Sequence, residues 1–244
     1  MISDPILPVL PPFDPERVPV THRDSGLPSV HASRLQRAWL RSRFAKVPDW
    51  TPEVFEDVAH ARSVATRQAA VLVPLVERPH GVQLLLTRRD ANLHVHAGQI
   101  SFPGGSRDLD DATPVHTALR EAEEEIGLRP DRVETLGLMP VYTTITGYAV
   151  TPVIAMIDPD APLRPQPSEV AEVFEVPLDF LMNPAHHELR TWDTQTGLGA
   201  LGLAPVPTRR SFYAMPWTAA DGRRYFIWGA TAAMIRNLYR LLIA

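Results

Sequence analysis

Four glutamates fall within five residues of the segment TALREAEEEIGL, which covers residues 117–128. In an α-helix, a rotation of 100° per residue places Glu121, Glu124 and Glu125 on one face, while Glu123 points away from them. Three carboxylates this close repel each other, and a bound divalent cation would relieve the repulsion. Oxygen ligands favour hard ions, above all Mg²⁺ or Mn²⁺ bound jointly with phosphates. The spacing indicates a metal site, although a bare acidic run of this kind is more often a solvated helix face.

A glycine pair lies shortly before these acids, in SFPGGSRDLDD at residues 101–111. Gly104 and Gly105 let the backbone approach a metal ion or a phosphate more closely than any side chain would allow. Alone, such a pair is usually only a turn. Followed by the acidic face, it predicts a loop and a helix that bind phosphate and metal together.

The acidic face requires a helix, and its flanking residues predict one from Pro114 to Gly127. Proline suits the first helical turn, and glycine suits the left-handed residue that ends a helix. The apolar residues of this segment occupy a separate sector, which would anchor the helix in the core and leave the acids at its edge.

The rest of the chain predicts a mixed sheet. Two runs rich in leucine and β-branched residues, QAAVLVPLVE and VQLLLTRR, are separated by the turn-forming RPHG and predict adjacent strands. Further strands are expected at 133–142 and 148–157, helices at 177–182 and 229–243, and loops at 159–167 and 196–207. Because strands and helices do not follow a regular βαβ period, the predicted fold class is α/β (α+β), with helices on the faces of a mixed sheet.

The N-terminal part differs in composition. Seven prolines in the first thirty residues disfavour regular hydrogen bonding and predict an extended arm, either a tail or a strap. The segment ASRLQRAWLRSRFA at 32–45 predicts an amphipathic helix packed on the core, with a phosphate-binding role for its arginines as the alternative.

Composition excludes several classes of protein. The chain has 244 residues, which suit one medium-sized domain with extensions, and its net charge of −4 provides no basic surface for nucleic acid. The absence of cysteine removes disulfides, thiolate metal sites and cysteine nucleophiles. Neither a signal peptide nor a membrane span is evident, so we expect a cytoplasmic protein without a membrane partner. The sequence does not report an oligomeric state.

The acidic segment resembles the Nudix box, G-x5-E-x7-R-E-U-x-E-E-x-G-U, where U is apolar. From Arg120 onward the match holds at every fixed position. Counting back from this arginine, however, places Ala112 at the expected glutamate and Ser106 at the expected glycine. One extra residue therefore lies between the glycine pair and the arginine, with Asp110 and Asp111 near the missing acid.

The preceding residues narrow the resemblance. LLTRRDANLHVHAGQISFPGG at 85–105 resembles the signature L-L-T-x-R-S-x-x-L-x-x-H-x-G-Q-x-x-F-P-G-G of coenzyme A-type Nudix pyrophosphatases, whose lengthened box has an aspartate near this position. The run IWGATA at 227–232 is similar to that subgroup's closing segment. The resemblance implies a Nudix-like mixed β-sheet sandwiched between helices. It also implies a Nudix hydrolase domain at 66–244, which would follow the proline-rich arm at 1–30 and a helical extension at 31–65.

The resemblance also implies roles for the acids. Glu121 and Glu125 would be the principal ligands of Mg²⁺ or Mn²⁺, joined by the carbonyl oxygen of Gly105. Glu124 would be a third ligand or would orient the attacking water, and Arg120 would hold the glutamates in place. These roles match what hydrolysis of a diphosphate demands, namely charge neutralisation and an in-line water.

The general base is less constrained, because relatives draw it from different positions. Glu169 is the candidate outside the box and Glu172 the next to test, although each taken singly suits a surface acid before a strand. His94 and His96 belong to the signature and are expected to shape the substrate loop, with a role as base or ligand as the alternative.

The implied substrate is coenzyme A or an acyl derivative, cleaved to 4′-phosphopantetheine and adenosine 3′,5′-bisphosphate. Its 3′-phosphate requires cations, for which Arg89 matches the signature, with Arg88 and Arg107 nearby. Gly104 would approach the phosphates, and Phe102 is a candidate contact for the pantetheine arm. Hydrolysis of ADP-ribose or another dinucleotide, and nucleotide sensing without cleavage, remain alternatives. An eroded acidic face would mark the sensor, and all three acids are present.

Overall fold

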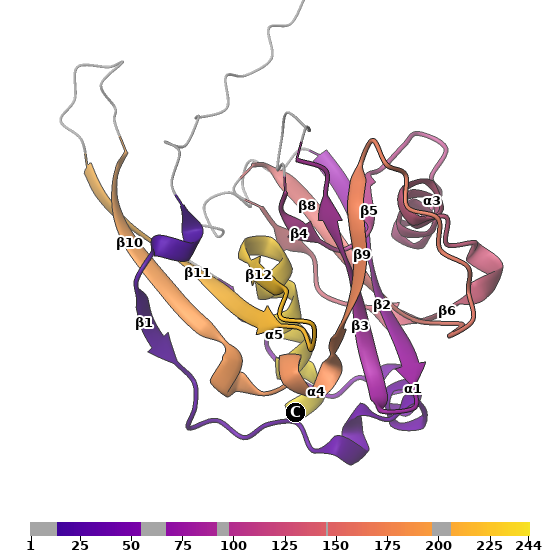
Figure 1. Ribbon diagram of the computed structural model, residues 1–244, viewed down its shortest axis with the longest axis horizontal. Helices are drawn as coiled ribbons and strands as arrows, with labels where there is room; N and C mark the ends of the chain where they lie inside the picture. The colour runs from indigo at the N-terminus through magenta and orange to yellow at the C-terminus, as the bar shows by residue number, and fades with distance from the viewer. Residues whose placement is uncertain (1–13, 55–66, 92–97, 145, 197–205) are drawn as a thin grey trace, which may run out of the picture.

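A mixed eight-stranded sheet forms the centre of the molecule (Figure 1). The computed structural model describes residues 14–54, 67–91, 98–144, 146–196 and 206–244. The main path of the sheet runs β4-β3-β2-β8-β6, with β5, β7 and β9 paired to β2, β8 and β3. Among the strand pairs that these described residues form, only β2 and β8 are parallel, which makes the sheet mixed, as predicted. Its strands are β2 (Arg67–Arg78), β3 (Gly81–Arg89), β4 (Ile100–Ser101), β5 (Gly104–Ser106), β6 (Val133–Leu138), β7 (Tyr142–Thr143), β8 (Tyr148–Ile157) and β9 (Val170–Pro177).

The predicted hairpin is present between β2 and β3, which pair antiparallel around the turn that ends at Gly81. Side chains of β3 alternate between the two faces of the sheet: Leu84 and Leu86 join one buried cluster, and Leu85 joins the other. Because both faces are covered, β2, β3 and β8 are apolar over most of their length, which explains the continuous hydrophobic runs in the sequence.

Helix α3 (Pro114–Ile126) covers one face of the sheet and confirms the predicted acidic helix. Its N-cap is Thr113, whose side chain accepts a hydrogen bond from the amide of His116. Gly127 ends the helix with a φ of 67°, in the left-handed region that favours glycine. Ala118, Ala122 and Ile126 are fully buried against the sheet, so the apolar sector fixes the direction of the acidic one.

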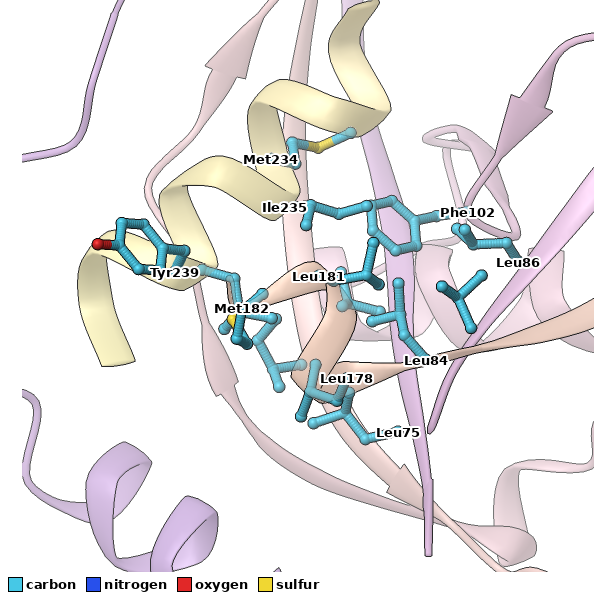
Figure 2. Close-up of a cluster of buried hydrophobic side chains, with 14 of the residues drawn as sticks. Leu75, Leu84, Leu86, Phe102, Leu178, Leu181, Met182, Met234, Ile235 and Tyr239 are labelled. Atoms are coloured by element: carbon cyan, nitrogen blue, oxygen red, sulfur yellow. The ribbon is translucent and has the colours of Figure 1, made fainter. Parts of the chain in front are cut away.

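Helices α4 (Leu178–Leu181) and α5 (Gly229–Ile243) lie over the opposite face. Figure 2 shows side chains from α5, among them Ile235 and Tyr239, gathered with leucines of β2, β3 and α4. The sheet is therefore sandwiched between helices, which confirms the predicted architecture. The part of the chain that the structure describes contains no helix long and apolar enough to cross a membrane.

A second, four-stranded antiparallel sheet was not predicted. It has the order β1-β10-β11-β12 and consists of β1 (Val20–Arg23), β10 (Glu188–Thr196), β11 (Val206–Thr218) and β12 (Arg224–Trp228). Strand β1 belongs to the proline-rich start, where regular hydrogen bonding was not expected, and that expectation is wrong for these four residues. The physical reason is local, because no proline lies between Pro19 and Pro28 and the amides there remain free to pair with β10.

The N-terminal helix is shorter than predicted. Residues 32–45 form the 3-10 turn η2 (Ala32–Leu35) and helix α1 (Arg37–Ala45), separated by Gln36 with an extended ψ of 145°. Leu40 and Phe44 are buried, and Phe44 lies against Gly137 of β6. The helix therefore packs on the core, as expected. Three further 3-10 turns are η1 (Pro15–Arg17), η3 (Pro130–Arg132) and η4 (Pro184–His186).

Candidate functional site

The glycine pair on β5 lies directly against the acids of α3. A Cβ on Gly105 would lie 2.5 Å from Oε2 of Glu121, and a Cβ on Gly104 would lie 2.5 Å from the carbonyl oxygen of Ala70. The amide of Gly104 also donates a hydrogen bond of 3.1 Å to Oε2 of Glu125. Each glycine is thus required for a different close approach, one to the neighbouring strand and one to a carboxylate.

Arg120 binds several of the surrounding acids at once. Its guanidinium donates to Glu121 and Glu124, each at 3.0 Å, and to both carboxylate oxygens of Asp111 at 3.2 and 3.0 Å. It also donates to the carbonyl oxygen of Ser106 at 3.0 Å. The hydrogen bonds to Asp111 and then to Glu121 raise the pKa of Arg120 above its usual value. The arginine therefore joins the loop after β5 to the acidic face of α3.

Asp111 is the acid that compensates for the irregular first half of the box. Its side chain is buried, whereas the neighbouring Asp110 is exposed. Besides binding Arg120, it accepts a hydrogen bond of 3.0 Å from the amide of Asp108. The hydrogen bond from Arg120 is the main reason that the pKa of Asp111 is lowered to about 2. The sequence left two aspartates open, and burial distinguishes them.

Glu125 is a buried carboxylate with little compensation. It is 4 % exposed, accepts one backbone hydrogen bond, and lies 3.6 Å from the guanidinium of Arg89. Burial raises its pKa to about 7, despite the opposing effects of Gly104 and Arg89. Burial also raises the pKa of Glu121. Two acids that resist ionisation side by side are suited to a cation, which would favour their charged forms.

Within the described ranges, no group of three or more histidine, aspartate or glutamate side chains is close enough to hold a metal ion. The contacts explain this, because the third acid of the face, Glu124, is exposed and directed to Arg120. The structure thus brings Glu121 and Glu125 to the glycine pair, whereas Glu124 is held at the rim.

Arg89 is placed beside this pair of acids. Its Nε atom is buried and has no hydrogen-bond partner among the described residues. Glu169 lies before β9 with an exposed side chain, and its charge contributes to the raised pKa of Glu125. Its carbonyl oxygen accepts a hydrogen bond of 2.9 Å from the amide of Asp90, next to Arg89. Two predicted site residues from distant segments therefore lie near the acids of α3.

Other predicted residues lie elsewhere. Arg88 forms an ion pair with Glu172, which also contacts Arg223 and accepts a hydrogen bond of 2.8 Å from Tyr225. This cluster joins β3 and β9 to β12, away from Glu125, because neighbouring residues of a strand face opposite sides. The side chain of Phe102 is 2 % exposed and packs in the core (Figure 2).

Arg107 donates a hydrogen bond of 3.0 Å to the carbonyl oxygen of Asp111 and so stabilises the loop before α3. His94 and His96 lie outside the described residues. A recess between residues 52–54, residues 139–143 and α5 is lined by none of the predicted site residues.

Sequence reasoning missed a contact at the start of two strands. Arg67 begins β2 and Tyr148 begins β8, and the two residues pair in the parallel register. A guanidinium nitrogen of Arg67 donates to the phenol of Tyr148 at 3.4 Å. No local pattern signals this contact, because it depends on a pairing between segments about eighty residues apart.

Comparison with known proteins identifies this arrangement. Residues 66–194 match the family model described as the NUDIX domain. The chain belongs to the Nudix family. Proteins named Uncharacterized Nudix hydrolase NudL are 42% identical in Escherichia coli K12 and 43% identical in Shigella boydii, over 173 residues that cover 70% of this chain and 81% of the relative. Together with the box at Arg120–Leu128, these matches establish a Nudix hydrolase of mixed α/β fold.

Solved Nudix structures resemble this chain over a smaller part of its length than the NudL proteins do. RenU from M. smegmatis is 29% identical with a TM-score of 0.40, over 46% of this chain and 71% of its own. The Nudix domain of Shewanella oneidensis NrtR, solved with ADP ribose, is 20% identical with a TM-score of 0.37, over 59% of this chain and 84% of its own.

The first prediction concerns the Asp111–Arg120 pair. Asp111→Asn should lower the free energy of unfolding near neutral pH by about 2–3 kcal/mol, because it removes one charge of a buried, hydrogen-bonded pair. The low pKa means that Asp111 stabilises the fold above its unfolded pKa, and that this contribution is lost as the pH falls towards 2. Urea unfolding at several pH values would measure the change, with exposed Asp110→Asn as the control. An equal effect of both substitutions would contradict the assignment.

The second prediction concerns Glu125 in protein treated with a chelator. Its raised pKa means that ionisation costs the folded state free energy, a cost that appears as the pH rises from the unfolded pKa towards 7. Glu125→Gln should therefore stabilise the protein at pH 8, by at most about 3 kcal/mol, and have little effect near pH 4. Thermal unfolding with chelator present would test this. Glu123→Gln, on the exposed side of α3, is the matched control. A difference that does not change with pH would rule out the proposed cause.

Proposed function

We propose that this Nudix hydrolase cleaves the diphosphate linkage of coenzyme A or acyl-coenzyme A in the presence of Mg²⁺ or Mn²⁺. Water adds across the phosphoric anhydride, so the products are 4′-phosphopantetheine, or its acyl form, and adenosine 3′,5′-bisphosphate. The observation that carries the proposal is the convergence of Glu121 and Glu125 on Gly104 and Gly105, the glycine pair that ends the segment resembling the coenzyme A-type signature.

The chemistry of the donors suits a hard divalent cation. Glu121 and Glu125 supply carboxylate oxygens, and Gly105 would offer its carbonyl oxygen. Both carboxylates have raised pKa values because of burial, and a cation would remove the cost of keeping them ionised. Such an ion neutralises charge on the diphosphate and promotes attack by water. Glu124, held at the rim by Arg120, would serve as a third ligand or orient the water.

Residues around these acids would handle the substrate. The buried, unpartnered Nε of Arg89 is a donor suited to a phosphate oxygen. The absence of side chains at Gly104 and Gly105 lets the neighbouring strand and Glu121 approach closely, and the diphosphate would bind beside this backbone. Glu169 is the candidate general base, since it is exposed and close enough to Glu125 to influence its pKa. Arg120 is a positioning residue, because its contacts are to acids and to a backbone carbonyl.

Two predicted residues are given less weight in this proposal. Arg88 is engaged by Glu172, and Glu172 in turn by Arg223 and Tyr225, so their contacts stabilise the junction between the two sheets. Phe102 would support the substrate loop from the core rather than touch the pantetheine arm directly.

The third prediction tests the metal role. Glu125→Gln should lower kcat for coenzyme A hydrolysis at least about a hundredfold while the protein stays folded, because it removes a ligand charge but little volume. Chelation should abolish activity of the wild type, and added Mg²⁺ should raise its melting temperature but not that of the variant. Steady-state kinetics with Glu123→Gln as the control would measure this. Unchanged turnover in Glu125→Gln would exclude the metal role.

The substrate itself is tested with a panel. Coenzyme A, acetyl-coenzyme A, ADP-ribose and a dinucleotide diphosphate would be incubated with the enzyme and Mg²⁺, and the products identified by mass spectrometry. We expect the coenzyme A compounds to have the highest kcat/KM. Preferential hydrolysis of ADP-ribose would contradict coenzyme A as the substrate but would still support metal-dependent diphosphate hydrolysis. Binding without hydrolysis would indicate a nucleotide sensor.

A further inference from the structure

A cationic and aromatic cluster lies at the same end of the sheet as the candidate site. Arg67 at the start of β2 contacts the phenol of Tyr148, and its guanidinium lies 5.8 Å from the centre of the tyrosine ring. The hydroxyl of Ser106 is also hydrogen-bonded to that phenol. These residues come from β2, β5 and β8, three neighbouring strands of the sheet.

The cluster is connected to the acids of α3 through Ser106. The carbonyl oxygen of Ser106 accepts a hydrogen bond from Arg120, while its side chain reaches Tyr148. The residue before it is Gly105, which lies against Glu121. Strand β5 therefore places Gly105 next to the residue whose side chain contacts Tyr148.

Distance indicates which part of a substrate would reach the cluster. Gly105 pairs with Ala70, and Arg67 lies three residues further along β2, or about 10 Å at the usual rise of a strand. The two phosphorus atoms of a diphosphate share one bridging oxygen and cannot span that separation. A group at Arg67 would thus belong to a different part of the substrate.

The donors of the cluster suit a phosphate. The guanidinium of Arg67 is exposed and carries a fixed charge. The phenol oxygen of Tyr148 accepts a hydrogen bond from Arg67 and is hydrogen-bonded to Ser106, and a phenol can also donate its own proton to a phosphate oxygen. These donors also lower the pKa of Tyr148, which strengthens the phenol as a hydrogen-bond donor.

We propose that Arg67 and Tyr148 form a subsite for a phosphomonoester of the substrate, separate from the diphosphate that is cleaved. The inference rests on the proposed function for the identity of that group, which in coenzyme A is the 3′-phosphate. It assigns substrate selectivity to two residues outside the Nudix box and outside the signature at 85–105.

Binding measurements test the subsite without requiring catalysis. Calorimetry with Mg²⁺ would compare adenosine 3′,5′-bisphosphate with 5′-AMP for the wild type, Arg67→Ala and Tyr148→Phe. The wild type should prefer the bisphosphate, and each substitution should reduce that preference about tenfold or more while affinity for 5′-AMP stays within about twofold. Arg67→Lys should recover part of the preference. Arg129→Ala, at an exposed arginine bonded to Asp131, is the control.

Kinetics provide the second measurement. For Arg67→Ala and Tyr148→Phe, kcat/KM should fall with coenzyme A and remain unchanged with 3′-dephospho-coenzyme A. An equal fall for both substrates, or an unchanged bisphosphate preference in both variants, would overturn the subsite. A wild type that prefers the bisphosphate but does not hydrolyse coenzyme A would contradict the proposed function and leave the subsite supported.

Discussion

The close approach of β5 to helix α3 is the constraint on which the site depends. A side chain at position 105 would occupy the space of the Glu121 carboxylate, and the amide of Gly104 is the only backbone donor that the structure records for Glu125. Strand pairing with β2 fixes the glycines, and apolar packing fixes the helix. The two acids are therefore desolvated by the fold itself, which raises their pKa values, and a bound cation would favour their charged forms.

The same constraint explains why an irregular box is tolerated. A loop connects β5 to the acidic helix, and both of its ends are held in place by the sheet and the helix. One extra residue in that loop changes the sequence position at which an acid can reach Arg120. Asp111 reaches Arg120 although its position in the sequence is shifted, because the contact depends on where the carboxylate lies in the fold. Since Arg120 also binds Glu121 and Glu124, the loop, the helix and the acids form one connected network.

Local patterns predicted the parts of the fold that depend on local physics. The hairpin, helix α3 with its terminal Gly127 and helix α5 follow from periodicity, turn residues and capping. The four-stranded sheet did not follow, since β1 and β10 pair across more than 160 residues and neither segment shows a strong strand pattern. Within the site, the acids and glycines could be predicted from spacing. The orientation of Arg88 away from Glu125, and the pairing of Arg67 with Tyr148, required the register of the strands.

Because side chains alternate between the two faces of β3, the adjacent residues Arg88 and Arg89 make different contacts. Arg89 faces α3 and leaves a buried donor beside the acids, whereas Arg88 faces β12 and is bound by Glu172. The contacts of Glu172 with Arg223 and Tyr225 connect the main sheet to the four-stranded one at the strand that also carries Arg89. The second sheet thus constrains the position of β3 from the face opposite the acids.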